Sequence, residues 1–156
     1  MSRKWLAKSE PNNYSIVDLR RDKKTLWTGV RNYQARNLLR DEWAKGDEVL
    51  FYHSNAKPSG VYGLAKVTKA KVADPTQFDP KSDYYDPKAK KDKPTWFAPE
   101  ITFVSIFKAP ISIEDIKKDA ALKNMEVLRK GSRLSVQPVK DMEYKRVLMM
   151  SEKKSG

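Results

Sequence analysis

The stretch LWTGVRNYQARN, residues 26–37, carries the strongest structural signal in this chain. Trp27 stands just before a helix begins, and Asn32 is a good N-cap because its side-chain oxygen can accept the free backbone N–H groups of the first turn. Arg31 and Arg36 flank that helix start, where the partial positive charge of the helix also lies. An aromatic ring, a helix N-terminus and two guanidinium groups together suit a flat, anionic ligand such as a nucleotide.

Apolar patterns on both sides of this stretch predict a mixed α+β fold. We expect strands at 4–8, 48–53, 61–72 and 96–107, and a short strand late in 130–139. We expect helices at 16–21, 32–43, 113–118 and 141–150, with a short helical patch at 120–128. The run 96–107 is apolar on both faces, which is typical of a central strand, and Pro110 should stop it. The pattern favours a small mixed-sheet barrel with short helices packed over its ends.

The length of 156 residues fits one domain, which we place at 1–150. A charged loop is expected at 21–24. Residues 74–95 are rich in Pro and Lys and should form a long loop, mobile around 88–93. Residues 151–156 are expected to form a disordered tail.

Composition restricts the classes of partner and chemistry. The net charge of +12 favours anionic partners such as nucleic acid, although a basic protein without a polyanionic partner would also carry such a charge. The chain has no Cys and a single His, so we expect no disulfide, no thiol nucleophile, no metal site and no cofactor. The N-terminus lacks the apolar run of a signal peptide, and no segment approaches membrane-spanning length. We therefore expect no membrane association and a cytoplasmic setting, nucleoid-associated if the protein is bacterial.

Four segments together resemble the EVE domain family: WLAKSEP (5–11), WTGVRNYQARN (27–37), GDEVLFYHS (46–54) and SRLSVQP (132–138). The resemblance extends from Trp5 to about Met150. It implies a PUA-like fold, a small β-barrel with flanking helices, similar to the YTH domain that reads methylated adenine in RNA. EVE domains are associated with recognition of modified bases, particularly modified cytosine in DNA.

The resemblance also implies site residues. Trp27 resembles the cage Trp of YTH domains and would stack on a base, with Gly29, Val30 and Tyr33 around it. Asn32 would read a base edge or serve only as a helix cap. A second aromatic wall is expected near Trp96, with Phe97 and the pair Tyr84–Tyr85 as competitors. Further base-binding candidates are Ser9, Tyr52, His53, Ser54 and Ser135, although a structural role is favoured for His53. The phosphate-binding candidates are Lys8, Arg31, Arg36 and Arg133.

These features predict a reader that takes a modified base, preferentially 5-methylcytosine or 5-hydroxymethylcytosine in DNA, into an aromatic pocket. A reader of modified RNA would use the same residues. Two further hypotheses for the same pocket are an enzyme acting on nucleotides and a small-molecule sensor. The single His and the absence of Cys and of carboxylates at metal-ligand spacing argue against the enzyme. The sequence does not identify an effector protein as partner.

Overall fold

Successive side chains along the first strand are buried on opposite sides of one sheet, as the two-residue period of a strand requires. In β1 (Lys4–Ser9), Trp5 and Ala7 enter one hydrophobic cluster and Leu6 enters another. β3 (Glu48–His53) repeats this alternation beside it. The sheet is therefore covered on both faces, which explains why these strands are so rich in apolar residues.

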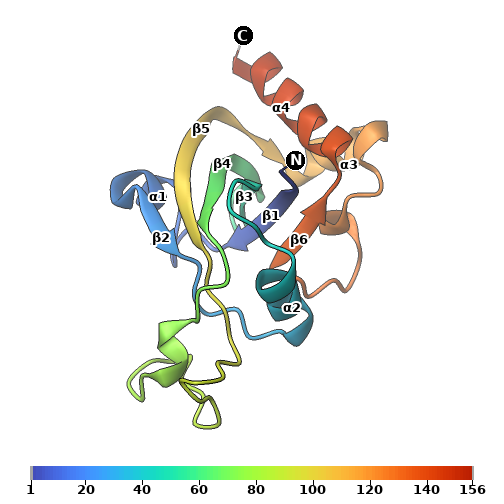
Figure 1. Ribbon diagram of the computed structural model, residues 1–156. Helices are drawn as coiled ribbons and strands as arrows, with labels where there is room; N and C mark the ends of the chain where they lie inside the picture. Colours follow the sequence, from blue (N-terminus) through green and yellow to red (C-terminus); the bar gives the residue numbers. More distant parts are fainter. Residues whose placement is uncertain (1, 156) are drawn as a thin grey trace.

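The computed structural model describes residues 2–155, and the sheet has the order β2–β5–β4–β3–β1–β6 (Figure 1). The four further strands are β2 (Lys24–Leu26), β4 (Gly60–Lys69), β5 (Glu100–Ser112) and β6 (Val136–Val139). β1 and β3 are parallel, and every other neighbouring pair is antiparallel. Because β1 and β3 run in the same direction, they end at the same edge of the sheet. The turns that follow them are thereby brought together.

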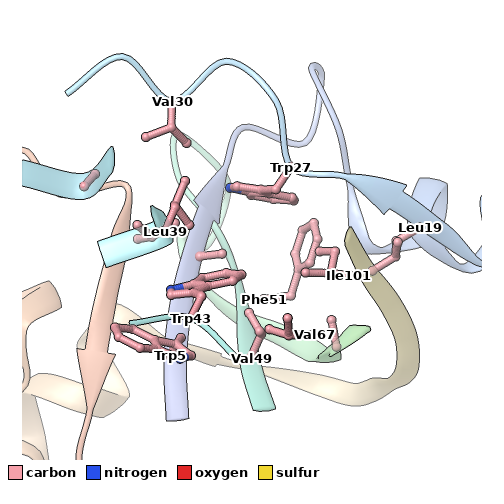
Figure 2. Packing of buried hydrophobic residues seen from close by; sticks show 14 of the residues in the cluster. Trp5, Leu19, Trp27, Val30, Leu39, Trp43, Val49, Phe51, Val67 and Ile101 are labelled. Carbon is pink, nitrogen blue, oxygen red and sulfur yellow. The ribbon is translucent and has the colours of Figure 1, made fainter. Parts of the chain in front are cut away.

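Helices cover the two faces of the sheet. α1 (Ile16–Asp22) and α2 (Tyr33–Asp41) contribute to the first hydrophobic cluster, part of which Figure 2 shows. α3 (Ile113–Lys118) and α4 (Asp141–Ser155) cover the other face (Figure 1). Short 3₁₀ helices lie at η1 (Pro75–Phe78), η2 (Ala120–Leu122) and η3 (Glu126–Leu128). The predicted α+β class with short flanking helices is confirmed, although the sheet is a curled half-barrel with β2 and β6 as its edges and is not closed.

Local capping places three of the helices where the sequence predicts them. Ser15 and Asp18 form a capping box at the start of α1, and Ser112 and Asp115 form another at α3. Asn32 caps α2, since its side-chain oxygen accepts a hydrogen bond from the backbone N–H of Ala35 at 2.9 Å.

The expectation that Pro110 ends a strand is wrong, because β5 continues to Ser112. The register between β4 and β5 shifts between the pairs Gly63–Ile106 and Val61–Ile111, so Pro110 falls in the interrupted part of the ladder. A residue without a backbone N–H is tolerated at such an irregularity.

Two further expectations need correction. Part of the charged loop expected at 21–24 belongs to β2, whose Lys24–Leu26 pair with β5 at the edge of the sheet. Of the disordered tail expected at 151–156, residues 151–155 instead form the end of α4, and Gly156 lies outside the described residues. Ser151 is buried there, and Lys154 forms an ion pair with Asp115 at 2.7 Å, which ties the end of α4 to α3.

Candidate functional site

A pocket of about 550 Å³ opens where β1 ends. Its wall comes from the end of β1 and the turn that follows it, from residues 25–30, and from residues 132–135 before β6, with single contributions from Ser54 and Tyr84. The parallel strands explain part of this assembly, since the backbone N–H of Ser54 donates to the carbonyl of Ser9 at 3.1 Å. The backbone N–H of Lys8 also donates to the carbonyl of Ser135 at 2.8 Å. The volume is in the range of about 300–1,000 Å³ that is usual for small-ligand sites.

The pocket brings together predicted site residues from all four sequence segments. Those that line it are Lys8, Ser9, Trp27, Gly29, Val30, Ser54, Arg133 and Ser135. Their individual binding roles stay predictions, but their placement in one cavity agrees with the sequence reasoning.

Trp27 lies in the pocket wall and in the hydrophobic core at once. Its side chain is 8% exposed, and its ring meets that of Phe51 edge-on at a centroid distance of 5.4 Å (Figure 2). Its backbone N–H donates to the carbonyl of Pro99 at 2.9 Å. The indole is therefore held rigidly before any ligand arrives, which reduces the entropy that binding would cost.

Tyr84 is another aromatic residue of the pocket wall, which also includes Trp27 and Tyr14. Its ring lies over Gly29, where a Cβ atom would be only 2.7 Å from the Cζ atom of Tyr84. Gly29 also has a φ of +85°, which disfavours any other residue. The sequence named Tyr84 only as a competitor for this wall, because nothing local indicates which aromatic residue of a long loop returns to the pocket.

Trp96, which the sequence favoured for the second wall, does not line the pocket. It is 5% exposed, its indole N–H donates to Asp86 at 2.9 Å, and the ring of Tyr33 packs against it at a tilt of 31° with centroids 4.9 Å apart. Tyr33 is likewise outside the pocket lining. Trp96 therefore anchors the loop 74–95 through Asp86 and does not face the pocket.

Arg31 holds that loop instead of lining the pocket. Its guanidinium donates to the Asp74 carboxylate at 3.0 Å, to the Thr76 hydroxyl at 3.1 Å and to the Tyr84 carbonyl at 2.8 Å. Asp74 is fully buried and also accepts hydrogen bonds from the backbone N–H of Gly29 and from Thr76. Burial alone would raise the pKa of Asp74, but these donors together hold it below its usual value.

Arg36 has a similar structural role. Its guanidinium donates to the carbonyl of Thr95 at 2.8 Å and lies over the rings of Tyr33 and Trp96. Neither Arg31 nor Arg36 is available at the pocket as the sequence led us to expect. Buried Gln77 links the two ends of the loop that they bind. Its side-chain amide forms hydrogen bonds with the backbone of Asp74, Thr95 and Trp96. Its mobility in solution stays a prediction.

Asn32, Tyr52 and His53 are also absent from the pocket lining. Asn32 serves as the cap of α2, and Tyr52 points to the other face of the sheet, into the second cluster. The His53 Nε2 atom accepts a hydrogen bond from the backbone N–H of Ile16 at 3.1 Å, and its ring stacks on Tyr62 at 4.1 Å. Burial lowers the pKa of His53, with Asp18 acting weakly in the opposite direction. The structural role favoured for His53 is consistent with this geometry.

The pocket wall is largely polar, with two cationic side chains, Lys8 and Arg133. Lys8 is half-buried, and burial lowers the pKa of its ammonium group, an effect that Glu126 partly offsets. The Ser9 hydroxyl donates to the carbonyl of Tyr14 at 2.7 Å, and the Ser132 hydroxyl is buried with no partner in the described chain. Glu10 and Asn13 also line the pocket but were not predicted from the sequence, although Glu10 directly follows Ser9 and Asn13 lies in the turn after β1.

The curled sheet carries a pocket with aromatic and cationic side chains at the end of β1. This is the architecture of a small domain that binds a ligand. The model of the EVE domain family matches residues 3–150. Human thymocyte nuclear protein 1 is 41% identical over 172 residues, which cover 98% of this chain and 76% of that protein. The chain belongs to the EVE domain family.

Solved structures agree with this assignment. A hypothetical protein from Leishmania major superposes with a TM-score of 0.94 at 42% identity, covering 100% of this chain and 98% of that one. The human THYN1 protein in complex with 5-methylcytosine containing DNA superposes with a TM-score of 0.87 at 39% identity, covering 97% of this chain and 98% of that one.

Two kinds of feature are absent from the part of the chain that the structure describes. No group of three or more His, Asp or Glu side chains among residues 2–155 is placed to hold a metal ion. Within the same range, no helix is long and apolar enough to cross a membrane.

Proposed function

We propose that this protein binds DNA that carries modified cytosine, with 5-methylcytosine as the main target, by taking the modified base into the pocket beside Trp27 and Tyr84. The observation that carries the proposal is the superposition of nearly the whole chain on human THYN1, which was solved with 5-methylcytosine containing DNA. The pocket supplies the chemistry that such a ligand needs. Aromatic rings can stack on a base, at about 1–3 kcal/mol per base, and Lys8 and Arg133 can contact phosphates.

We propose binding and not catalysis. His53, the one histidine of the chain, is engaged by Ile16 and Tyr62 outside the pocket, so it is not placed to act as a general base there. A reader needs only to recognise the base. The cytoplasmic or nucleoid setting expected from the sequence stays a prediction.

The test is a titration against matched oligonucleotides that differ at one base: cytosine, 5-methylcytosine, 5-hydroxymethylcytosine or N6-methyladenine. Each sequence is used as single-stranded DNA, duplex DNA and RNA. We expect one modified cytosine in DNA to bind more tightly than cytosine by roughly tenfold, because one methyl group in an apolar niche contributes about 1–3 kcal/mol. Preference for the RNA series would instead support a modified-RNA reader.

Two tryptophan variants identify the site. Trp27→Ala should remove the preference for the modified base. Trp43→Phe is the matched control, since Trp43 is a buried core indole that does not line the pocket. Circular dichroism at the titration temperature checks that both variants are folded. Equal, salt-sensitive binding of every oligonucleotide, unchanged in Trp27→Ala, would reduce the protein to a basic nucleic-acid binder and overturn the proposal.

A further inference from the structure

Glu10 is the one carboxylate among the side chains that line the pocket in the described chain. The other polar side chains there are hydroxyl, amide and cationic groups, and the whole protein carries a net charge of +12. A negative charge in this wall repels phosphate, so it opposes the electrostatic part of DNA binding. Its presence needs a different explanation.

The position of Glu10 is defined by its neighbours. Its backbone carbonyl accepts hydrogen bonds from the N–H groups of Asn13 and Tyr14, which close the turn after β1. Its Oε1 atom accepts a hydrogen bond from the Asn55 side chain at 2.8 Å, and no cation of the described residues forms an ion pair with it. One carboxylate oxygen is thus held, while the other is left to accept a hydrogen bond from a ligand.

A carboxylate can only accept, and this restricts the ligand groups that it favours. Cytosine presents an amino group at its 4-position, whereas thymine presents a carbonyl oxygen there. The carboxylate of Glu or Asp pairs with the cytosine N4 amino group and would repel the thymine O4 atom. A base taken out of the duplex exposes this edge to the pocket.

We infer that Glu10 selects the cytosine ring over the thymine ring by accepting a hydrogen bond from the N4 amino group. The inference rests on the proposed function and deepens it. Thymine and 5-methylcytosine carry the same methyl group at C5, so neither stacking on Trp27 and Tyr84 nor an apolar niche for the methyl can separate them. A group that reads the 4-position is required, and Glu10 is the side chain of the pocket lining in the described chain that can accept a hydrogen bond there but cannot donate one.

The test compares cytosine, 5-methylcytosine and thymine in one DNA sequence, each placed opposite an abasic site so that no base pair must be broken. Glu10→Gln is the informative variant, because its amide oxygen can still accept from Asn55 while its NH₂ group can now donate to thymine O4. We expect the ratio of 5-methylcytosine affinity to thymine affinity to fall at least about fivefold, the lower end of what one base-edge contact contributes. The ratio of 5-methylcytosine to cytosine should not change, since both bases carry the amino group.

Asn55→Gly is the control for a purely structural role of Glu10. It removes the side chain that holds Oε1 but keeps the carboxylate, and glycine accepts the φ of +49° at this position. It should retain discrimination against thymine better than Glu10→Gln does, while thermal unfolding reports any loss of stability in either variant.

The outcomes separate this inference from the proposed function. If the wild-type protein binds cytosine and 5-methylcytosine with equal affinity, the proposed preference for the modified base is overturned, whatever its affinity for thymine. A Glu10→Gln protein that discriminates against thymine as strongly as the wild type overturns the role of Glu10, even if the preference for 5-methylcytosine is intact. Wild-type binding of thymine and 5-methylcytosine with equal affinity would also overturn it.

Discussion

Replacing Arg31 by Ala should damage the fold of the loop 74–95 more than it damages electrostatic binding of DNA. Sequence reasoning placed Arg31 on a phosphate, whereas the structure places its guanidinium on Asp74, Thr76 and Tyr84. The two roles predict different measurements, so this one substitution tests which of them holds.

The magnitude follows from the contacts that are lost. The charge-assisted bond to buried Asp74 contributes about 1.5–3 kcal/mol, and each of the two other hydrogen bonds about 0.5–1.5 kcal/mol. Asp74 keeps donors from Gly29 and Thr76, and neighbouring contacts are not additive. We therefore expect Arg31→Ala to lower the free energy of unfolding by roughly 3 kcal/mol. For a protein of this size that corresponds to a Tm lower by about 6–12 °C.

The assay combines stability, exchange and salt dependence. Thermal and urea unfolding give the loss of stability, and hydrogen exchange should show faster exchange in residues 75–96 than elsewhere. Arg133→Ala is the matched control, because Arg133 is exposed and lines the pocket. It should change stability by less than about 0.5 kcal/mol, yet reduce the dependence of log affinity on log salt by about one ion.

A structural role of Arg31 is refuted if Arg31→Ala lowers the free energy of unfolding by less than about 1 kcal/mol, the contribution of a single neutral hydrogen bond, and changes the salt dependence of binding as Arg133→Ala does. That result would return Arg31 to the phosphate-binding role that the sequence suggested.

Two further predictions concern buried groups. Trp5→Phe should destabilise the fold by about 1–3 kcal/mol more than Trp43→Phe, because the Trp5 indole N–H donates to Asp47 at 2.9 Å while that of Trp43 is buried with no partner in the described chain; equal costs in urea unfolding would contradict this. The free energy of unfolding should fall as pH is lowered from 7 to 5. Burial lowers the pKa of His53 in the folded state below its ordinary 6.5. As pH falls through 6.5, the unfolded chain therefore binds a proton before the folded chain does. The stability that is present above pH 6.5 is lost between 6.5 and the lower folded-state pKa. His53→Gln should flatten this pH dependence, and a profile of unfolding free energy unchanged in the variant would assign it to other groups.

Part of the site could be predicted because it is local. Three short stretches have residue types that suit a ligand, and all of them line one pocket: Lys8–Ser9 at the end of β1, the segment around Trp27 and Gly29, and residues 133–135. Glu10 could have been found by the same reasoning, since it adjoins Ser9. What the motif did not reveal was that its carboxylate lies in the wall and is the one acid there.

Other site assignments failed because an exposed or paired state cannot be read from residue type. In the sequence, Arg31 and Arg36 cannot be distinguished from arginines that bind phosphate. Each is occupied by a partner far along the chain, Asp74 at a separation of 43 residues and Thr95 at a separation of 59. Trp96 and Tyr84 are both aromatic, so residue type alone does not show which ring lines the pocket and which supports the loop.

By itself, the sequence determined the local structure and the strongly basic character of the chain. The helix caps at Ser15, Asn32 and Ser112 depend on hydrogen bonds within three residues, and the alternation in β1 and β3 reflects the two-residue period of a strand. The net charge of +12 needs only counting. The tertiary structure alone decided which side chains are free to meet a ligand. That depends on long-range pairing, the parallel register of β1 with β3 and the return of the loop 74–95 over Gly29, which bring together residues that no local pattern connects.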